Sequence, residues 1–132
     1  MKFRLTIFTL VFTMMLPSTT FAEWTKRAFI NADGGKVTFY LDYERIRKHA
    51  GYVYYWTLVD HSTRSVGGYM SALDYWRGDC ELFRVKNMVH RQYSGQMGRG
   101  DNLATIDEED ADWTYPPPNS PNEMLLEDAC AR

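Results

Sequence analysis

Residues 52–59 read YVYYWTLV and carry the strongest strand signal in the chain. Aromatic and β-branched side chains favour a pleated, half-buried surface, and alternate residues of a strand point to opposite faces. One face would carry Tyr52, Tyr54, Trp56 and Leu58, and the other Val53, Tyr55, Thr57 and Val59. Because both faces are largely apolar, we expect a central strand that is covered on two sides.

The residues before this strand predict a β-hairpin and one helical turn. Residues 24–31 and 36–42 are rich in aromatic and β-branched residues, and residues 32–35 between them have the composition of a tight turn. The mixed polarity of residues 43–49 predicts a single helical turn, which Ala50 and Gly51 would end.

The residues after the strand predict three more strands. A turn over residues 60–68 leads to a strand from Tyr69 to Trp76, and a tight connection at 77–79 leads to a long strand from Cys80 to about Tyr93. A glycine-rich loop at 96–100 precedes a short strand at 102–106.

The C-terminal part predicts an extended connection and then a helix. Prolines 116–118 exclude a helix after Trp113-Thr114-Tyr115. Further on, Ser120 can cap a helix, Pro121 suits its first position, and Glu123 completes a capping box. We expect this helix to run to about Cys130, with Leu125, Leu126 and Ala129 towards the sheet.

The first 22 residues are typical of a secretory signal peptide. Lys2 and Arg4 precede an uncharged run that ends at Pro17, and small residues end the segment at Ala22. The alternative, an uncleaved membrane anchor, would need about 20 apolar residues, and this run is shorter. We therefore expect a mature domain of residues 23–132 in an exported compartment.

The charge and the cysteine positions limit what this domain can bind. Removal of Lys2 and Arg4 lowers the basic count from 15 to 13 against 17 acidic residues, which gives no support for nucleic-acid binding. The first cysteine is Cys80, so no thiol near the cleavage site could carry a lipid. We therefore expect a soluble, non-lipidated protein without a membrane anchor.

Cys80 and Cys130 are the two cysteines, and in an exported chain such a pair indicates one disulfide. Closing a loop of this length would remove about 4 kcal/mol of denatured-state entropy in the chain-entropy model. The alternative is two free thiols or a metal pair, which would need further ligands. The chain has three histidines, His49, His61 and His90, and their spacing matches no known zinc-ligand pattern.

Six short blocks resemble the surface-adhesin protein E-like family of Gram-negative bacteria in their order and spacing. The blocks are Tyr40-Leu41-Asp42 with Ile46-Arg47-Lys48, residues 55–60, Asp79-Cys80, residues 97–100, residues 113–116 and residues 120–130. The resemblance implies an α+β fold, with an antiparallel sheet of about six strands and a C-terminal helix packed on it. It also implies export and the Cys80–Cys130 disulfide. The adhesin that names the family is surface-located and binds host extracellular-matrix proteins.

A basic group marks the long strand predicted from Cys80. Arg84, Lys86 and His90 share one parity, Phe83, Val85 and Val89 share the other, and Arg91 and Arg77 complete the group. Such a cationic stripe could bind acidic glycans or an acidic protein segment. The alternative is an exposed sheet face that charged residues keep solvated.

Two further motifs have a functional and a structural interpretation. Arg-Gly-Asp occurs at 77–79 and at 99–101. The functional interpretation is recognition by integrins, and the structural one is that Gly and Asp simply form a turn. The acids at 107–110 and 112 suggest calcium, but they lack the ligand alternation and turn glycine of a calcium loop, which favours a solvated loop. We expect no metal and no cofactor.

The aromatic residues of 52–56 could form a stacking platform for a ligand or simply pack in the core. One short helix would hardly cover both faces of the sheet, so we also expect a homodimer or another partner.

The sequence has no nucleophile elbow, zinc-binding His pair or phosphate loop. The prediction is an exported, non-catalytic binding module of the adhesin type. The main alternative is a periplasmic interaction protein or inhibitor, for example of a cell-wall hydrolase, and a third is a minor enzyme.

Overall fold

The computed structural model describes residues 22–32 and 34–132, so the signal peptide predicted for residues 1–22 lies outside the described residues except for Ala22. The described part forms one sheet and one α-helix. Its strands are β1 (Thr25–Ala32), β2 (Gly35–Leu41), β3 (Arg47–His49), β4 (Tyr52–His61), β5 (Ser71–Asp79), β6 (Arg84–Tyr93) and β7 (Asn102–Asp107). The helices are α1 (Pro121–Cys130) and the short 3₁₀ turns η1 (Tyr43–Arg45) and η2 (Gln96–Gly98).

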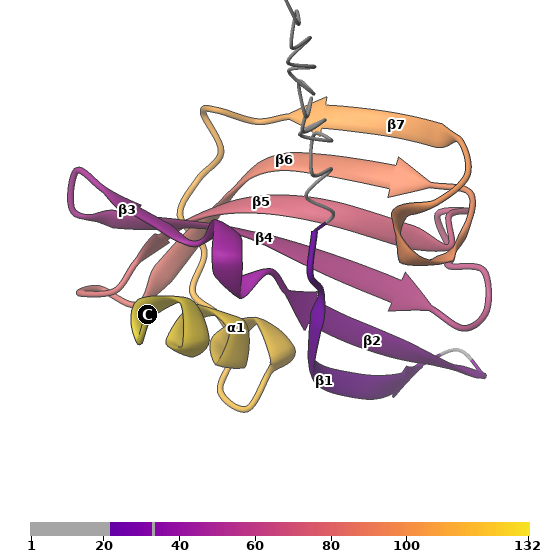
Figure 1. Ribbon diagram of the computed structural model, residues 1–132, viewed down its shortest axis with the longest axis horizontal. Helices are drawn as coiled ribbons and strands as arrows, with labels where there is room; N and C mark the ends of the chain where they lie inside the picture. The colour runs from indigo at the N-terminus through magenta and orange to yellow at the C-terminus, as the bar shows by residue number, and fades with distance from the viewer. Residues whose placement is uncertain (1–21, 33) are drawn as a thin grey trace, which may run out of the picture.

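The sheet is an antiparallel meander. Its strand order is β1-β2-β4-β5-β6-β7, and β3 pairs with the start of β4 beside this path (Figure 1). Consecutive strands joined by short turns pair as neighbours, as antiparallel hairpins do. The predicted α+β fold, with an antiparallel sheet and a C-terminal helix, is therefore confirmed.

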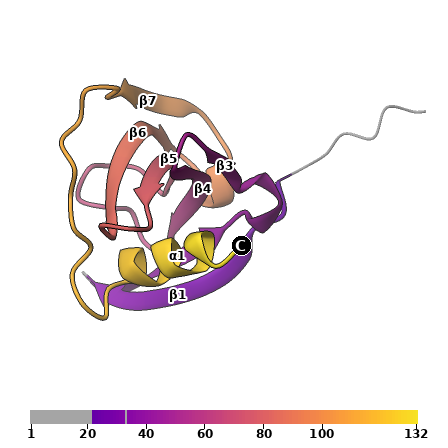
Figure 2. The ribbon, with the colours of Figure 1, turned by 90° about the vertical axis from the view of Figure 1, so that its left-hand side faces the viewer.

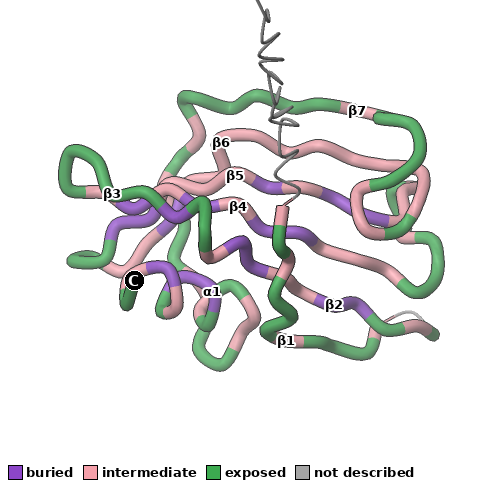
Figure 3. Tube along the Cα trace, viewed as in Figure 1, coloured by how far each residue is buried: buried purple, intermediate pink, exposed green. Residues whose placement is uncertain are grey.

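The main core lies between α1 and one face of the sheet, which we call the helix face. Leu125, Leu126 and Ala129 of α1 are at most 1% exposed, and they pack with Val53 and Tyr55 of β4. Figure 2 shows α1 between β1 and the β4–β5 part of the curved sheet. Burial is concentrated in β2, β4, β5 and α1, whereas β1 and β7 are largely exposed edge strands (Figure 3).

The disulfide prediction is confirmed, and it fastens α1 to the sheet. Cys80 lies just after β5 and Cys130 in the last turn of α1, and their Cα atoms are 5.8 Å apart. At the other end of the helix, Ser120 Oγ accepts from the Glu123 amide at 3.2 Å, as a capping residue does. The Glu123 carboxylate accepts from the Asn119 amide, one residue earlier than in the predicted capping box.

One predicted turn is in the wrong place. The connection predicted at 77–79 lies inside β5, and the chain turns at residues 80–83 instead. The turn forms there because the Asp79 carboxylate accepts from the amides of Glu81 and Leu82, and Phe83 adopts a φ of 51°. The long strand therefore begins at Arg84 rather than at Cys80.

The helical turn predicted over residues 43–49 is also shorter than expected. Only Tyr43–Arg45 form it, and Arg47–His49 form β3. Ala50 and Gly51 both have positive φ angles, 51° and 83°, which is the backbone of the tight hairpin turn that joins twisted strands. Residues 47–54 are thus a small hairpin in which His49 pairs with Tyr52.

Candidate binding site

The face of β4 opposite α1 carries Tyr52, Tyr54, Trp56 and Leu58. At one end of this face the η2 loop covers the sheet, because the Met97 amide donates to Asp60 Oδ1 at 2.7 Å and the Gly98 amide donates to Ser71 Oγ at 2.9 Å. Leu58 is fully buried there, whereas the three aromatic residues are only partly buried. The predicted central strand is therefore covered on two sides, but the second cover is incomplete.

Beyond η2, aromatic rings and arginine side chains stack in one continuous row. We call this row the aromatic–arginine ladder, and its members in order are Trp113, Tyr52, Arg77, Tyr54, Tyr75, Trp56 and Arg91. The ring centroids of neighbouring aromatic members are 4.8–6.1 Å apart, and each guanidinium carbon lies 5.4–5.6 Å from a ring centroid. These distances are within the range of aromatic and cation–π attraction.

Two further cations, Arg84 and Lys86, lie at the Trp113 end of the row, and we count them as part of the ladder. The Arg84 guanidinium carbon is 4.3 Å and the Lys86 Nζ is 5.0 Å from the centroid of the Trp113 ring. Arg84 also donates to the Asp79 carboxylate at 3.0 Å. Within the described part of the chain, the other cations of the ladder, Arg77, Lys86 and Arg91, form no ion pair.

Strand register explains how distant residues reach one row. Tyr54 pairs with Arg77 and Trp56 with Tyr75 across β4 and β5, and Arg77 in turn pairs with Lys86 across β5 and β6. Directly paired residues of neighbouring strands share a face, so their side chains stack. Trp113 belongs to the connection before α1. It is held beside β6 because the backbone of the next residue, Thr114, exchanges two hydrogen bonds of 2.8 Å with Val85.

A β-bulge in β6 changes which residues of the predicted basic stripe lie together. Asn87 pairs with Trp76 and Val89 with Tyr75, so Met88 is an extra residue that shifts the alternation of side chains. As a result Arg91 shares the ladder face with Arg84 and Lys86, and His90 lies on the helix face. The prediction that Arg84, Lys86 and His90 share one face is wrong for His90, because unbroken alternation was assumed.

His90 instead forms part of a polar cluster on the helix face. Its Nδ1 is 2.6 Å from Asp74 Oδ1, and the Asn87 amide nitrogen donates to the same oxygen at 2.7 Å. The Asp74 hydrogen bond raises the pKa of His90 above its usual value, and burial opposes this. Asp74 is 5% exposed, so the histidine supplies the partner that a buried carboxylate needs.

Tyr75 and Trp113 are members of the ladder that sequence reasoning did not single out. Tyr75 could have been found by extending the period-2 pattern into the next strand, since a central strand pairs on both sides. Trp113 could not, because it lies outside the regular strands and reaches the sheet through the single bridge at Thr114.

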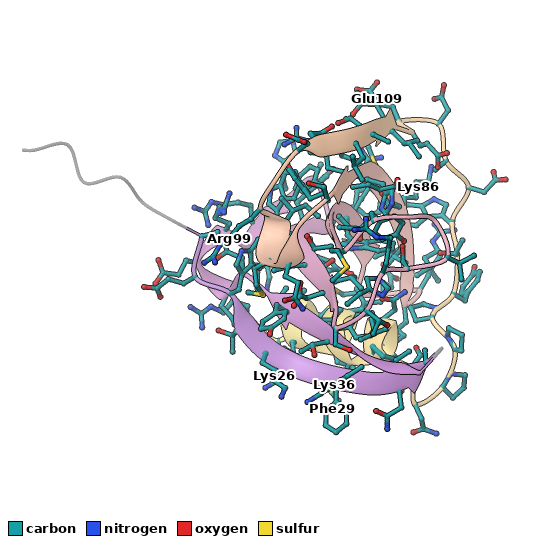
Figure 4. The ribbon with its side chains drawn as sticks, turned by 90° about the vertical axis from the view of Figure 1, so that its right-hand side faces the viewer. Lys26, Phe29, Lys36, Lys86, Arg99 and Glu109 are labelled. Carbon is teal, nitrogen blue, oxygen red and sulfur yellow. A yellow bond between two sulfur atoms is a disulfide. The ribbon has the colours of Figure 1, made fainter. Side chains whose placement is uncertain are left out.

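The two Arg-Gly-Asp tripeptides have different environments. At 77–79 both Gly78 and Asp79 are buried in β5, and the Asp79 carboxylate is held by Arg84 and two turn amides. At 99–101 all three residues are exposed between η2 and β7, where Figure 4 labels Arg99. Only the second tripeptide is accessible to a receptor.

The acidic stretch forms an exposed connection after β7. Within residues 22–32 and 34–132, no group of three or more His, Cys, Asp or Glu side chains is placed to hold a metal ion. None of the helices in the described part of the chain has the length and apolar character needed to cross a membrane.

Comparisons with known proteins agree with the fold and with the spaced blocks of sequence. A search of curated proteins gave no match. A family model described as surface-adhesin protein E matches residues 24–131, which are most of the chain. That description implies an exported, cell-surface location and binding to other proteins rather than catalysis. The match spans the whole sheet, the disulfide and α1, and on this basis the chain belongs to the surface-adhesin protein E family.

Proposed function

We propose that this protein is an exported, non-catalytic adhesin that binds host extracellular-matrix proteins through the aromatic–arginine ladder. The observation that carries the proposal is the partly exposed row of rings and cations on the face opposite α1. Aromatic residues and arginine are the side chains most enriched at the energetic centres of protein interfaces. Family membership supports a binding role in general.

The cations of the ladder support a partner that is acidic at the contact. Arg77, Lys86 and Arg91 bring three positive charges to a chain with a formal net charge of −2. Such a local excess attracts negatively charged surfaces and speeds their association. Of the residues in the predicted basic group, the proposed site thus retains Arg77, Arg84, Lys86 and Arg91 and omits His90.

Binding to immobilised matrix proteins tests the proposal. The variant Lys86→Glu/Arg91→Glu should lose most of the binding, because it reverses two charges of the ladder. The variant Lys26→Glu/Lys36→Glu is a matched control, since it makes the same charge change around the exposed Phe29. Equal loss in both variants, or no binding by the wild type, would remove the proposed function.

Location is a second part of the proposal. We propose that residues 1–22 direct export and are removed, and that the mature protein carries no lipid. Protease treatment of intact cells should degrade a surface protein and spare a periplasmic one. Intact mass should correspond to residues 23–132 with two hydrogens lost at the disulfide; a lipid-sized mass increment or a retained leader would contradict this.

A homodimer remains a separate prediction. We expect it because one helix cannot cover both sheet faces; η2 covers one end of the second face, and the ladder beyond it remains partly exposed. Sedimentation at increasing protein concentration tests it, and an unchanged monomer mass would count against self-association.

A further inference from the structure

Stacking leaves the arginines of the ladder with hydrogen-bond donors to spare. The Arg77 guanidinium carbon lies 5.6 Å from the centroid of the Tyr52 ring and 5.4 Å from that of the Tyr54 ring. A guanidinium has five N–H donors in its plane, and cation–π contacts alone leave these donors without acceptors. Arg77 Nε is a buried nitrogen for which the described residues provide no hydrogen-bond partner, and a ligand could not reach it directly. The residue as a whole is only partly buried, and a ligand oxyanion that meets its terminal guanidinium nitrogens would gain charge-assisted hydrogen bonds.

The cations are spread along the ladder rather than gathered at one point. Arg84 and Lys86 lie at the Trp113 end, Arg77 lies between Tyr52 and Tyr54, and Arg91 lies on Trp56 at the other end. Several ring-to-ring steps of 4.8–6.1 Å therefore separate the outer cations. A small anion could reach one of these positions, whereas a linear polymer with repeated negative groups could reach all of them.

The chemistry between the cations suits a polymer rich in hydroxyl groups. Tyr52, Tyr54 and Tyr75 each bring a phenol, which both donates and accepts hydrogen bonds. None of the three has a side-chain hydrogen bond among the described residues. Sugar hydroxyls make the same kind of bond, so a polysaccharide could occupy the positions between its charged groups.

Two other polyanions fit less well. An acidic peptide commonly adds its backbone to a free sheet edge, but β4, β5 and β6 are internal strands whose backbone is paired on both sides. Single-stranded nucleic acid stacks its bases on open ring faces, and here the ring faces already contact each other or a guanidinium. Nucleic-acid binding also favours a strongly basic domain, and this chain is acidic overall.

We infer that the ladder binds the sulfated glycosaminoglycan chains of matrix proteoglycans. This inference rests on the proposed function and specifies its partner. The sulfates would pair with Arg77, Lys86 and Arg91, and the sugar hydroxyls would bond to the tyrosines between them.

Titration of the mature protein with heparin-derived oligosaccharides of defined length, followed by calorimetry, tests the inference. The wild type should bind the sulfated oligosaccharide, lose binding to its desulfated form, and bind more weakly as salt is raised. Polyglutamate and single-stranded DNA of equal charge should bind at least about tenfold more weakly. These comparisons use the wild-type protein, so they do not depend on the folding of any variant.

Variants then locate the site. Lys86→Gln/Arg91→Gln should weaken binding of the sulfated oligosaccharide about tenfold or more, since each loses a charged hydrogen bond. Lys26→Gln/Lys36→Gln removes the same charge around Phe29, which lies well apart from Lys86 in Figure 4, and should bind like the wild type. Equal weakening in both variants would overturn the inference.

The inference and the proposed function can fail separately. Binding to matrix proteins that persists after enzymatic removal of glycosaminoglycans, with no binding to the free oligosaccharide, would overturn the inference and leave the adhesin function standing. Binding to the free oligosaccharide without any retention on matrix proteins would overturn the proposed adhesin function and leave the glycan-binding inference standing. Equally tight binding of polyglutamate or DNA would overturn the choice of a glycan.

Discussion

Gly78 lies in β5 where α1 packs against the sheet. A Cβ atom at this position would be 2.7 Å from Leu126 Cδ1 and 2.8 Å from Val53 Cγ1, both shorter than real contacts. We predict that Gly78→Ala lowers the free energy of unfolding by about 1–3 kcal/mol, because the added methyl must displace buried side chains. Urea denaturation measures the change.

Gly67→Ala is the control for that variant. Gly67 is exposed in the turn before β5. An added Cβ there would also make a short contact, 2.8 Å from Tyr69 Cε1, but this ring is partly exposed next to the turn rather than packed beneath α1. Exposed substitutions of this kind change stability by at most about 0.5 kcal/mol. If the two alanine variants lost equal stability, Gly78 would not be a point of close packing between α1 and β5.

The His90–Asp74 pair predicts a pH dependence of stability. The hydrogen bond to Asp74 raises the pKa of His90 above 6.5, so the charged histidine stabilises the folded state. This contribution is complete below the usual pKa of histidine and disappears as pH rises through the raised value. The stability difference between the wild type and His90→Gln should therefore be larger at pH 5.5 than at pH 8.5, as urea denaturation would measure.

His49→Gln serves as the reference for this experiment, since His49 is exposed on β3. Burial lowers the pKa of His61, and this destabilises the folded protein as pH falls, so the wild-type profile alone mixes two opposite effects. Subtracting the His90→Gln profile isolates the pair. A difference that stayed constant with pH would show that folding does not change the pKa of His90, which would contradict a stabilising charged pair with Asp74.

At the level of elements, α1 depends on the disulfide for its attachment. Its apolar face is short, and the bond from Cys130 to Cys80 closes a loop of 50 residues. We predict that Cys80→Ser/Cys130→Ser lowers the free energy of unfolding by about 4 kcal/mol, from the restored entropy of the unfolded chain. Amide exchange should also speed up at Leu125 and Leu126.

Reduction of the wild type provides the control for the cysteine variant. The reduced protein and the double-serine variant should unfold at the same urea concentration, because both lack the covalent link. Unchanged stability after reduction would mean that packing alone holds α1 on the sheet.

Strands and the helix were predictable where one local signal dominated. The β1–β2 hairpin, β4 and the capped α1 follow from alternation, turn composition and Ser120-Pro121. The hairpin at β3 was missed because its turn requires Ala50 to adopt a positive φ, which the residue type does not indicate. The turn at 80–83 was missed because Asp79 stabilises it through its side chain.

The candidate site was predictable only in part. Alternation correctly grouped Arg84 with Lys86, but a single extra residue at Met88 moved His90 away and brought Arg91 in. A bulge is a property of paired strands, so one strand read alone gives no sign of it. The stacking of Trp113 on Tyr52 depends likewise on contacts between residues far apart in the sequence.

In the molecule as a whole, the two faces of the sheet have different roles. The helix face carries α1, the disulfide-linked core and the Asp74–His90 pair, and it stabilises the domain. The opposite face carries the ladder, where rings and cations remain partly exposed. A ligand of the ladder should therefore perturb one face and leave the other unchanged.

The indole signals of the tryptophans in an NMR spectrum test this division most directly. Trp56 and Trp113 belong to the ladder, whereas the Trp76 indole donates to Thr57 Oγ1 at 2.9 Å on the helix face. Titration of the labelled mature protein with a heparin-derived oligosaccharide should shift the Trp56 and Trp113 signals and leave that of Trp76 in place. A shift of Trp76 with Trp56 and Trp113 unmoved would contradict the assignment of the ladder as the binding surface.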